Sequence, residues 1–356
     1  MALAMYMDQV LSGEVPKVAI DLYDRSLANL APSYLTHLLN QKLMCRLNDK
    51  SATYTYSNGG NTITATYDDG CVEILTKTGN NSWRCTYYSA DGEVLENVTT
   101  TYDEASGQVR VSSSVAGSVN GIVPFADATF EEIAIMLKRH YAGIIDLSEY
   151  WNVGDTKRIS YGAMPAAGVG ETHNSATQAI TIIGFNHDDM TGGGKAAVTL
   201  QFVNGIGNAG YVHRVASNAG GWRDSARRAW MENVFIGSLD DKLQAMIKPV
   251  DKLCSLGNRS NQLLSTSDRA FLLSESEIMG RSVTQGVLNE GEQYAYFKNA
   301  QNRRKKQNDA VSGYDNWWTR SPARANASQY VYVESDGDIH ISDASSAYRI
   351  VVAFCI

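Results

Sequence analysis

The chain has 356 residues, of which 44% are hydrophobic, and its formal net charge is −7 at pH 7. This length allows two or three domains, and the apolar content can fill a core that needs no disulfide or metal for support. The acidic balance argues against a nucleic-acid-binding protein. The five cysteines lack CxxC or Cys/His ligand spacing, so no structural zinc site is expected.

The N-terminal stretch "MALAMYMDQVLSGEVPK" has no basic n-region, so we expect no signal peptide. No apolar run approaches the roughly 20 residues that a membrane-spanning helix needs, and no membrane association is expected. Residues 17–44 read as two helices separated by Pro32, because proline ends a helix. The sequence therefore predicts a helical N-terminal segment over residues 1–48.

Residues 49–120 have a different pattern of short alternating runs such as "TITATY" and "CVEILTK". Turn sequences such as "NGGN", "DDG" and "ADG" separate these runs, which predicts an antiparallel β domain, either a meander or a small sandwich. Cys71 and Cys85 could pair across neighbouring strands, although an odd cysteine total favours reduced, buried thiols.

Residues 121–147 read as a linker and a docking helix, "ATFEEIAIMLKRHYAG". Thr129 with Glu132 forms a capping-box pattern at its start, and Gly143 is a stop signal. From residue 148 to 356 the pattern predicts a compact domain, so the fold class is α+β. Its strands are expected at 179–185, 196–202 and 269–274, and its helices at about 223–235 and within 239–253.

The domain ends with a predicted β-hairpin and a buried strand over 349–356. Alternating apolar residues flank the turn pair Asp336-Gly337, which predicts the hairpin. Four aliphatic residues should hold it on the core: Val331, Val333, Ile339 and Ile341. The opposite face should carry a mixed set of polar and aromatic residues, including Tyr332, Glu334, Asp338 and His340.

Two clusters could carry chemistry, and in both cases the structural interpretation is favoured. His187, Asp188 and Asp189 could bind a divalent cation, but the EF-hand pattern is absent and a polar turn with Gly192–Gly194 is the preferred interpretation. The run "NRRKKQN" could grip phosphate, but a solvated loop is preferred. No histidine accompanies a nucleophile motif such as GxSxG, so no catalytic residue is assigned.

The segment "NWWTRSP" places two tryptophans in succession on a strand. Trp317 and Trp318 should point to opposite faces, so at least one belongs to the core and the other could support the outer surface, although core scaffolding is the preferred interpretation. Arg320 reads as a structural clamp at the start of a loop.

Several blocks, including "YWNVGDTKRI", "GGWRDSARR", "TSDRAFLLSESEIMG", "WWTRSPARA" and "VVAFCI", resemble a family of domains common in phages and prophages of gut bacteria. The chain also resembles the variable proteins of diversity-generating retroelements, whose ligand-binding domain has a C-type lectin fold akin to the formylglycine-generating enzyme. The resemblance covers about residues 148–356. It implies a C-terminal variable region, about 317–356, in which Asn-type codons are rewritten while core residues stay fixed. Of the hairpin residues, Glu334 cannot be reached from an Asn codon, so it is either fixed or has a different template codon.

The resemblance implies a non-enzymatic receptor-binding protein, a component of a phage tail or fibre tip that binds a host-surface protein or glycan. The N-terminal region would contact other virion proteins and form a homo-oligomer, of which a trimer is one form. Neither a cofactor nor a metal ligand is assigned. The alternatives are an enzyme of the formylglycine-generating or metal-dependent sugar-active type and a purely structural virion decoration protein. The expected ligand-binding residues are Arg324, Asn326, Tyr332, Glu334, Asp338, His340, Ser342, Asp343, Ser346 and Tyr348.

Overall fold

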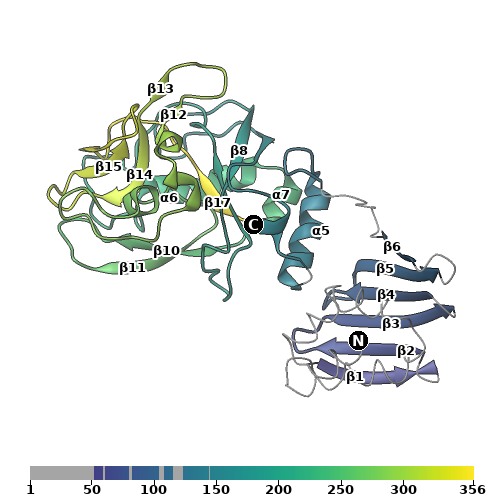
Figure 1. Cartoon of the computed structure of the whole chain (residues 1–356). Coiled ribbons are helices and arrows are strands. Elements are labelled where there is room, and N and C mark those ends of the chain that lie inside the picture. The colour runs from purple at the N-terminus through teal and green to yellow at the C-terminus, as the bar shows by residue number, and fades with distance from the viewer. Residues whose placement is uncertain (1–51, 59–60, 80–81, 104–107, 115–122, 144) are drawn as a thin grey trace. The chain divides into compact units, whose positions relative to one another are not determined.

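The computed structural model describes residues 52–58, 61–79, 82–103, 108–114, 123–143 and 145–356 (Figure 1). The predicted helices at 17–44 lie outside these residues. The chain divides into two compact units, one of residues 1–123 with 135–146 and the other of residues 124–134 with 147–356. Within the described ranges, no helix is both long and apolar enough to span a membrane.

The first unit contains a six-stranded antiparallel sheet in which each strand pairs with the next along the chain. This order makes it a meander, as one of the two predicted arrangements requires. Side chains alternate between the two faces of this sheet, and one buried face carries Tyr67, Leu75 and Tyr87. Cys71 and Cys85 are both free thiols. The strands are β1 (Ala52–Ser57), β2 (Thr62–Tyr67), β3 (Val72–Gly79), β4 (Ser82–Tyr88), β5 (Val94–Asp103) and β6 (Gln108–Ser114).

Helix α5 (Phe130–Tyr141) begins and ends where its sequence signals predict. The Thr129 hydroxyl accepts a 3.2 Å hydrogen bond from the Glu132 backbone N–H, and the Glu132 carboxylate accepts a 2.7 Å bond from the Thr129 N–H. This reciprocal pair is the capping box, which satisfies two backbone donors at the helix start. Gly143 follows the helix with φ of 70°, a left-handed conformation that glycine adopts without strain.

The second unit is built around a four-stranded antiparallel sheet in the order β17-β9-β8-β7. Its strands are β7 (Thr156–Tyr161), β8 (Ala176–Phe185), β9 (Val198–Phe202) and β17 (Ala353–Cys355). Phe202 contacts the rings of Tyr161 and Phe235, each 5.9 Å away between centroids, on the apolar face of this sheet. The C-terminal segment is shorter as a strand than predicted, but all residues from Ile350 to Ile356 are buried.

Two predicted elements of this unit differ from the structure. The helix expected within 239–253 is present but ends at Met246, and Val250 begins a strand after Pro249, which disfavours a helical conformation at the residue before it. The strand expected over 269–274 is absent, although Phe271 forms an isolated β-bridge with Ala353. Leu272 and Leu273 are buried, and their carbonyls accept hydrogen bonds from the side chain and from the backbone N–H of Arg320, respectively.

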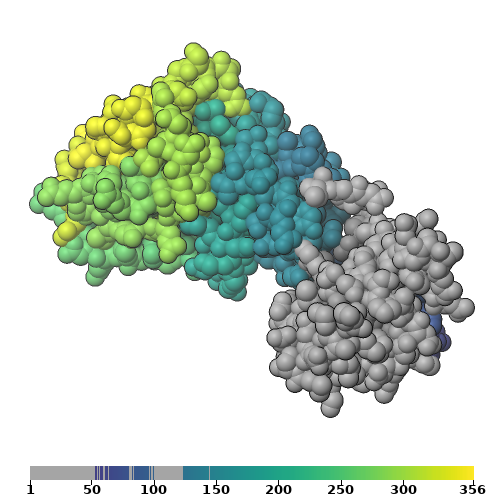
Figure 2. Space-filling model, viewed as in Figure 1, coloured from purple at the N-terminus to yellow at the C-terminus, as the bar shows by residue number. Residues whose placement is uncertain are grey.

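A third sheet, of strands β14, β15 and β16 in that order, carries the C-terminal hairpin. Its strands are β14 (Trp317–Pro322), β15 (Gln329–Val333) and β16 (Ile339–Asp343). Figure 2 shows the yellow atoms of the C-terminal residues at the surface of this unit. The remaining elements are η3 (Leu147–Glu149), α6 (Ala226–Trp230), η4 (Met231–Phe235), η5 (Ile236–Ser238), α7 (Asp241–Met246), β10 (Val250–Ser255), β11 (Leu263–Asp268), α8 (Glu275–Met279), η6 (Ala295–Lys298), η7 (Ala300–Arg303), β12 (Lys305–Lys306) and β13 (Tyr314–Asp315). This mixture of helices and antiparallel sheets confirms the α+β class.

Candidate functional site

The predicted hairpin is present, and its turn has the expected geometry. The Glu334 N–H donates to the Asp338 carbonyl at 2.8 Å, and Gly337 adopts φ of 96° in the turn. Tyr332 and His340 form a directly opposed cross-strand pair. Their side chains therefore lie on one face of the hairpin, as the period of two requires.

Aromatic side chains form the centre of this face. The ring of Tyr332 lies 4.5 Å from that of Tyr348 and 5.9 Å from that of His340, between centroids. Beside Tyr332, on the neighbouring strand β14, lies the indole of Trp318, with its ring 4.8 Å from that of Tyr348 and 6.1 Å from that of Tyr332. Trp318 is fully buried and donates its ring N–H to the Gly210 carbonyl at 2.9 Å, so this side of the cluster is fixed. Both tryptophans are fully buried, as the core interpretation requires, and Trp318 also contacts the rings of the outer face.

Polar groups surround the rings. The Ser342 hydroxyl accepts from the Tyr348 hydroxyl at 3.2 Å and donates to that of Ser346 at 3.0 Å. The imidazole of His340 lies 2.9 Å from the Glu334 carboxylate, with side chains 52% and 38% exposed. Burial and the neighbouring Tyr348 raise the pKa of Tyr332 to about 12, so its hydroxyl stays a hydrogen-bond donor at neutral pH. We call this set the hairpin surface: Tyr332, Glu334, His340, Ser342, Ser346 and Tyr348.

The buried side of the hairpin is smaller than predicted. Val331 and Val333 are fully buried, but Ile339 is only half-buried and Ile341 is 38% exposed. The expectation that all four aliphatic residues belong to the core is wrong, because β16 is the last strand of its sheet and has a neighbour on one side only. Tyr330, on the same face as Tyr332, is by contrast fully buried, so it does not belong to the hairpin surface, although its cross-strand partner Ser342 does.

The other predicted binding residues do not join the hairpin surface. Asp338 lies in the turn, and Asp343 points to the opposite face, where its carboxylate accepts from the Ser328 hydroxyl at 2.7 Å. Arg324 and Asn326 lie in the loop between β14 and β15. Arg324 and Asn326 therefore lie at the end of the hairpin away from the turn.

A residue that sequence reasoning missed holds that loop in place. The side-chain amide of Asn218 is fully buried and donates to the carbonyls of Ala323, Asn326 and Gln329 at 2.8, 2.9 and 2.8 Å. Its own oxygen accepts from the Asn258 N–H at 2.7 Å. A lone Asn in a loop gives no sequence signal for this role, because its partners lie over a hundred residues away.

A buried ionic network lies beside the hairpin sheet. The guanidinium of Arg320 forms two parallel bonds of 2.5 and 2.9 Å to the Glu277 carboxylate and donates to the carbonyls of Leu272 and Glu290 at 2.9 and 2.7 Å. Arg320 is thus a structural clamp as expected, but it sits inside β14 and is wholly buried rather than at the start of a loop.

The His187-Asp188-Asp189 segment forms part of a turn, which is the preferred interpretation. Gly193 and Gly194 adopt φ of 96° and 79° there. Asp188 is buried and accepts from the Lys252 ammonium at 2.6 Å. Burial opposes its ionisation, but the charge of Lys252 and the adjacent His187 ring outweigh burial and hold the pKa of Asp188 well below its usual value. Over the described ranges, no three acidic, His or Cys side chains are grouped as metal ligands.

The run "NRRKKQN" is not simply a solvated loop, because Lys305 is buried. Its ammonium lies 5.2, 5.4 and 6.0 Å from the ring centroids of Tyr296, Phe297 and Trp317. Burial lowers the pKa of Lys305 to about 7, and in the described part of the chain it forms no ion pair. Arg304 is half-buried, with its guanidinium 4.0 Å from the ring centroid of the exposed Tyr314.

Comparison with known proteins gives one family match for this chain. Residues 194–356 match the family described as Domain of unknown function (DUF6273). Neither a curated protein nor a solved structure matches the chain. The matched segment contains the hairpin surface, Trp318 and Arg320, so its C-terminal part is similar to a family whose function is undefined.

Proposed function

We propose that this chain is a non-enzymatic ligand-binding protein whose hairpin surface contacts a ligand on a host cell. The observation that carries the proposal is the hairpin surface itself, in which Tyr332 and Tyr348 pack against the buried Trp318 and His340 packs against the other side of Tyr332. Aromatic rings with serine hydroxyls and a charged pair are the side-chain types that paratopes use for contact area and adaptable hydrogen bonds.

The packing of this face supports binding energetically. Tyr332 and Tyr348 contact each other and the indole of Trp318, so their rings are ordered before a ligand arrives. A preordered side chain loses less conformational entropy on binding, which raises affinity without a new contact. Tyrosine anchors at the centre of an interface often cost about 2 kcal/mol or more when they are truncated.

The hairpin also separates positions that can vary from positions that cannot. Val331 and Val333 are buried, whereas Tyr332 and Glu334 on the other face are partly exposed. Substitution at exposed positions usually costs little folding free energy. This division, with the resemblance of sequence blocks over about 148–356, supports a C-type lectin-like domain of the variable-protein type carried at a phage tail or fibre tip. Other virion proteins would bind the N-terminal region.

Attachment to cells tests the proposal. Fluorescently labelled chain would be incubated with a panel of gut bacterial strains, alongside the double variant Tyr332→Ala/Tyr348→Ala and the variant Tyr314→Ala. Tyr314 is 42% exposed in the same unit but outside the hairpin surface, so it controls for loss of an exposed ring. We expect the parent and Tyr314→Ala to bind the same strains, and the double variant to lose binding while it stays folded. Equal binding by the double variant, or no strain bound by the parent, would contradict the proposal.

A further inference from the structure

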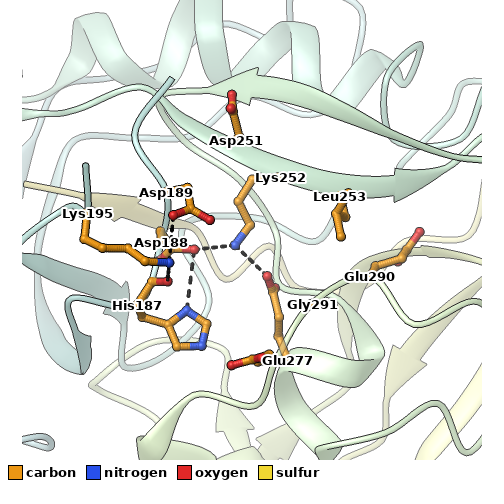
Figure 3. Close-up of a pocket in the computed structure, with 11 residues that line it drawn as sticks. His187, Asp188, Asp189, Lys195, Asp251, Lys252, Leu253, Glu277, Glu290 and Gly291 are labelled. Atoms are coloured by element: carbon orange, nitrogen blue, oxygen red, sulfur yellow. Dashed lines mark hydrogen bonds and ion pairs between the residues drawn. The ribbon is translucent and has the colours of Figure 1, made fainter. Parts of the chain in front are cut away.

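A second candidate site lies away from the hairpin surface, in a cavity of about 250 Å³ (Figure 3). Its floor is buried and includes Asp188, Lys252, Glu277 and Glu290. Its rim is exposed and includes Asp189, Lys195, Asp251, Leu253 and Glu292. We call this cavity the acidic pocket, because six of its lining residues are carboxylates and two are lysines.

Both lysines of the acidic pocket already have carboxylate partners. The Lys252 ammonium lies 2.6 Å from Asp188 and 2.5 Å from Glu277, and Figure 3 shows it between the two. The Lys195 ammonium lies 2.7 Å from Asp189 at the rim. An anionic ligand would therefore find no free cation in the wall.

Three carboxylates of the acidic pocket have no cationic partner among the described residues: Asp251, Glu290 and Glu292. Asp251 accepts only a neutral hydroxyl, that of Thr191, at 2.8 Å. Glu290 accepts from the Ser255 N–H and the Ser321 hydroxyl at 2.6 and 2.5 Å, and burial raises its pKa to about 7. Asp251 and Glu292 create a negative potential in a partly enclosed site, where electrostatic attraction is stronger than in open solvent, and Glu290 adds to it only in its ionised form.

His187 gives an independent sign that the acidic pocket is incomplete without a ligand. Its ring stacks on Tyr294 with centroids 4.0 Å apart, and its Nδ1 lies 3.6 Å from Asp188, beyond hydrogen-bond length. Both ring nitrogens are buried, and neither makes a hydrogen bond within the described structure. A buried polar atom without a partner costs free energy, and a bound group can supply that partner.

We propose that the acidic pocket binds the cationic head of a small organic ligand, an ammonium or a guanidinium group. Its volume is at the small end for ligand sites and suits such a head with a short carbon chain. The exposed side chain of Leu253 at the rim gives the apolar part of that chain a surface to pack on. The head would donate to Asp251 and Glu292 and, at depth, to Glu290 or to a ring nitrogen of His187. This site is separate from the hairpin surface, and neither proposal depends on the other.

Calorimetric titration of the whole chain with three capped amino acids tests the acidic pocket. The probes are N-acetyl-arginine amide, N-acetyl-lysine amide and the neutral isostere N-acetyl-citrulline amide, which differ mainly in side-chain charge. We expect one equivalent of an arginine or lysine probe to bind saturably, and the citrulline probe to bind about tenfold more weakly or worse, since each lost charge contact at a partly buried site costs over 1 kcal/mol.

Two double variants with the same change of net charge separate the acidic pocket from general attraction to an acidic protein. Asp251→Asn/Glu292→Gln should weaken binding of the cationic probe about tenfold or more. Glu232→Gln/Asp241→Asn, which removes two exposed carboxylates elsewhere in the same unit, should leave it within about twofold. Equal affinity for the citrulline probe, equal loss in the two double variants, or no saturable binding at millimolar probe would each overturn the proposal.

Discussion

The ring of Tyr348, in the segment after β16, packs 4.5 Å from the ring of Tyr332 in β15. The two tyrosines join the hairpin and the segment that follows it into one surface. The Ser342 hydroxyl accepts from the hydroxyl of Tyr348 and strengthens the same junction. A ligand that contacts both rings would therefore be recognised by a preformed face rather than by two independent segments.

Burial of the valine face predicts a sharp contrast between two substitutions on the same side of the hairpin. Val333→Asp places a charge at a fully buried position, whereas Ile341→Asp places it at a position 38% exposed. We expect Val333→Asp to cost about 4 kcal/mol or more and to unfold the C-terminal unit, because an unpaired buried charge has no compensation. Ile341→Asp should change the melting temperature little. Similar melting of the two variants would show that the hairpin is not anchored as described.

The buried guanidinium of Arg320 should matter far more than a surface one. Arg320→Met removes two bonds to Glu277 and several to backbone carbonyls, and leaves that carboxylate facing Lys252 alone. A loss of about 3–5 kcal/mol in unfolding free energy is expected from urea denaturation. Arg223→Met is the control, because Arg223 also pairs with a carboxylate, Asp224, but at the surface. Its stability should be nearly that of the parent, and an equal loss in both variants would refute the clamp role.

Lys305 predicts a pH dependence of stability in a defined window. Its pKa is about 7 in the folded chain and about 10.4 in an unfolded one, so folding must release a proton between these values. The unfolded state binds more protons there, and stability rises with pH by up to about 1.4 kcal/mol per unit. The faces of the three surrounding rings favour the charged ammonium, so they raise the lower pH limit of this window.

Lys305→Met removes the titrating amine, and with it this pH dependence of stability, while it keeps a side chain of similar length. Urea denaturation of parent and variant between pH 7 and 9.5 should therefore show the variant's advantage shrinking as pH rises, with a total change of about 2–3 kcal/mol. A difference between parent and variant that is constant with pH would show that Lys305 stays charged in the folded chain.

Local signals predicted much of the fold. The meander of the first unit, the capping box of α5 and the terminal hairpin follow from period and turn chemistry that lie within a few residues. The two elements that differ from the structure have another cause. Val250 extends the apolar stripe of helix α7 in the sequence, but Pro249 interrupts the helix before it. The segment "RAFLLS" has the composition of a strand, although carbonyls within it bond to Arg320.

The candidate sites divide in the same way. Alternation placed Tyr332 and His340 on one face and one of the two tryptophans on the same side, but it could not show that this residue is Trp318. It could not show that Ile341 is exposed, because burial of an edge strand depends on what packs against the sheet. The sequence singled out only the His187-Asp188-Asp189 run of the acidic pocket, because Lys252 and Glu277 come together with Asp188 only in the folded chain.

Site-specific photo-cross-linking tests the central claim most directly. His340 and Ile341 are adjacent in β16, both exposed, and point to opposite faces of the hairpin. The photoreactive residue p-benzoylphenylalanine would replace each in turn, and the labelled chain would be irradiated on bacterial cells that bind the parent. We expect a cross-link to a cell-surface component from position 340 and little from position 341. Cross-linking from position 341 alone, or equally from both, would contradict binding through the hairpin surface.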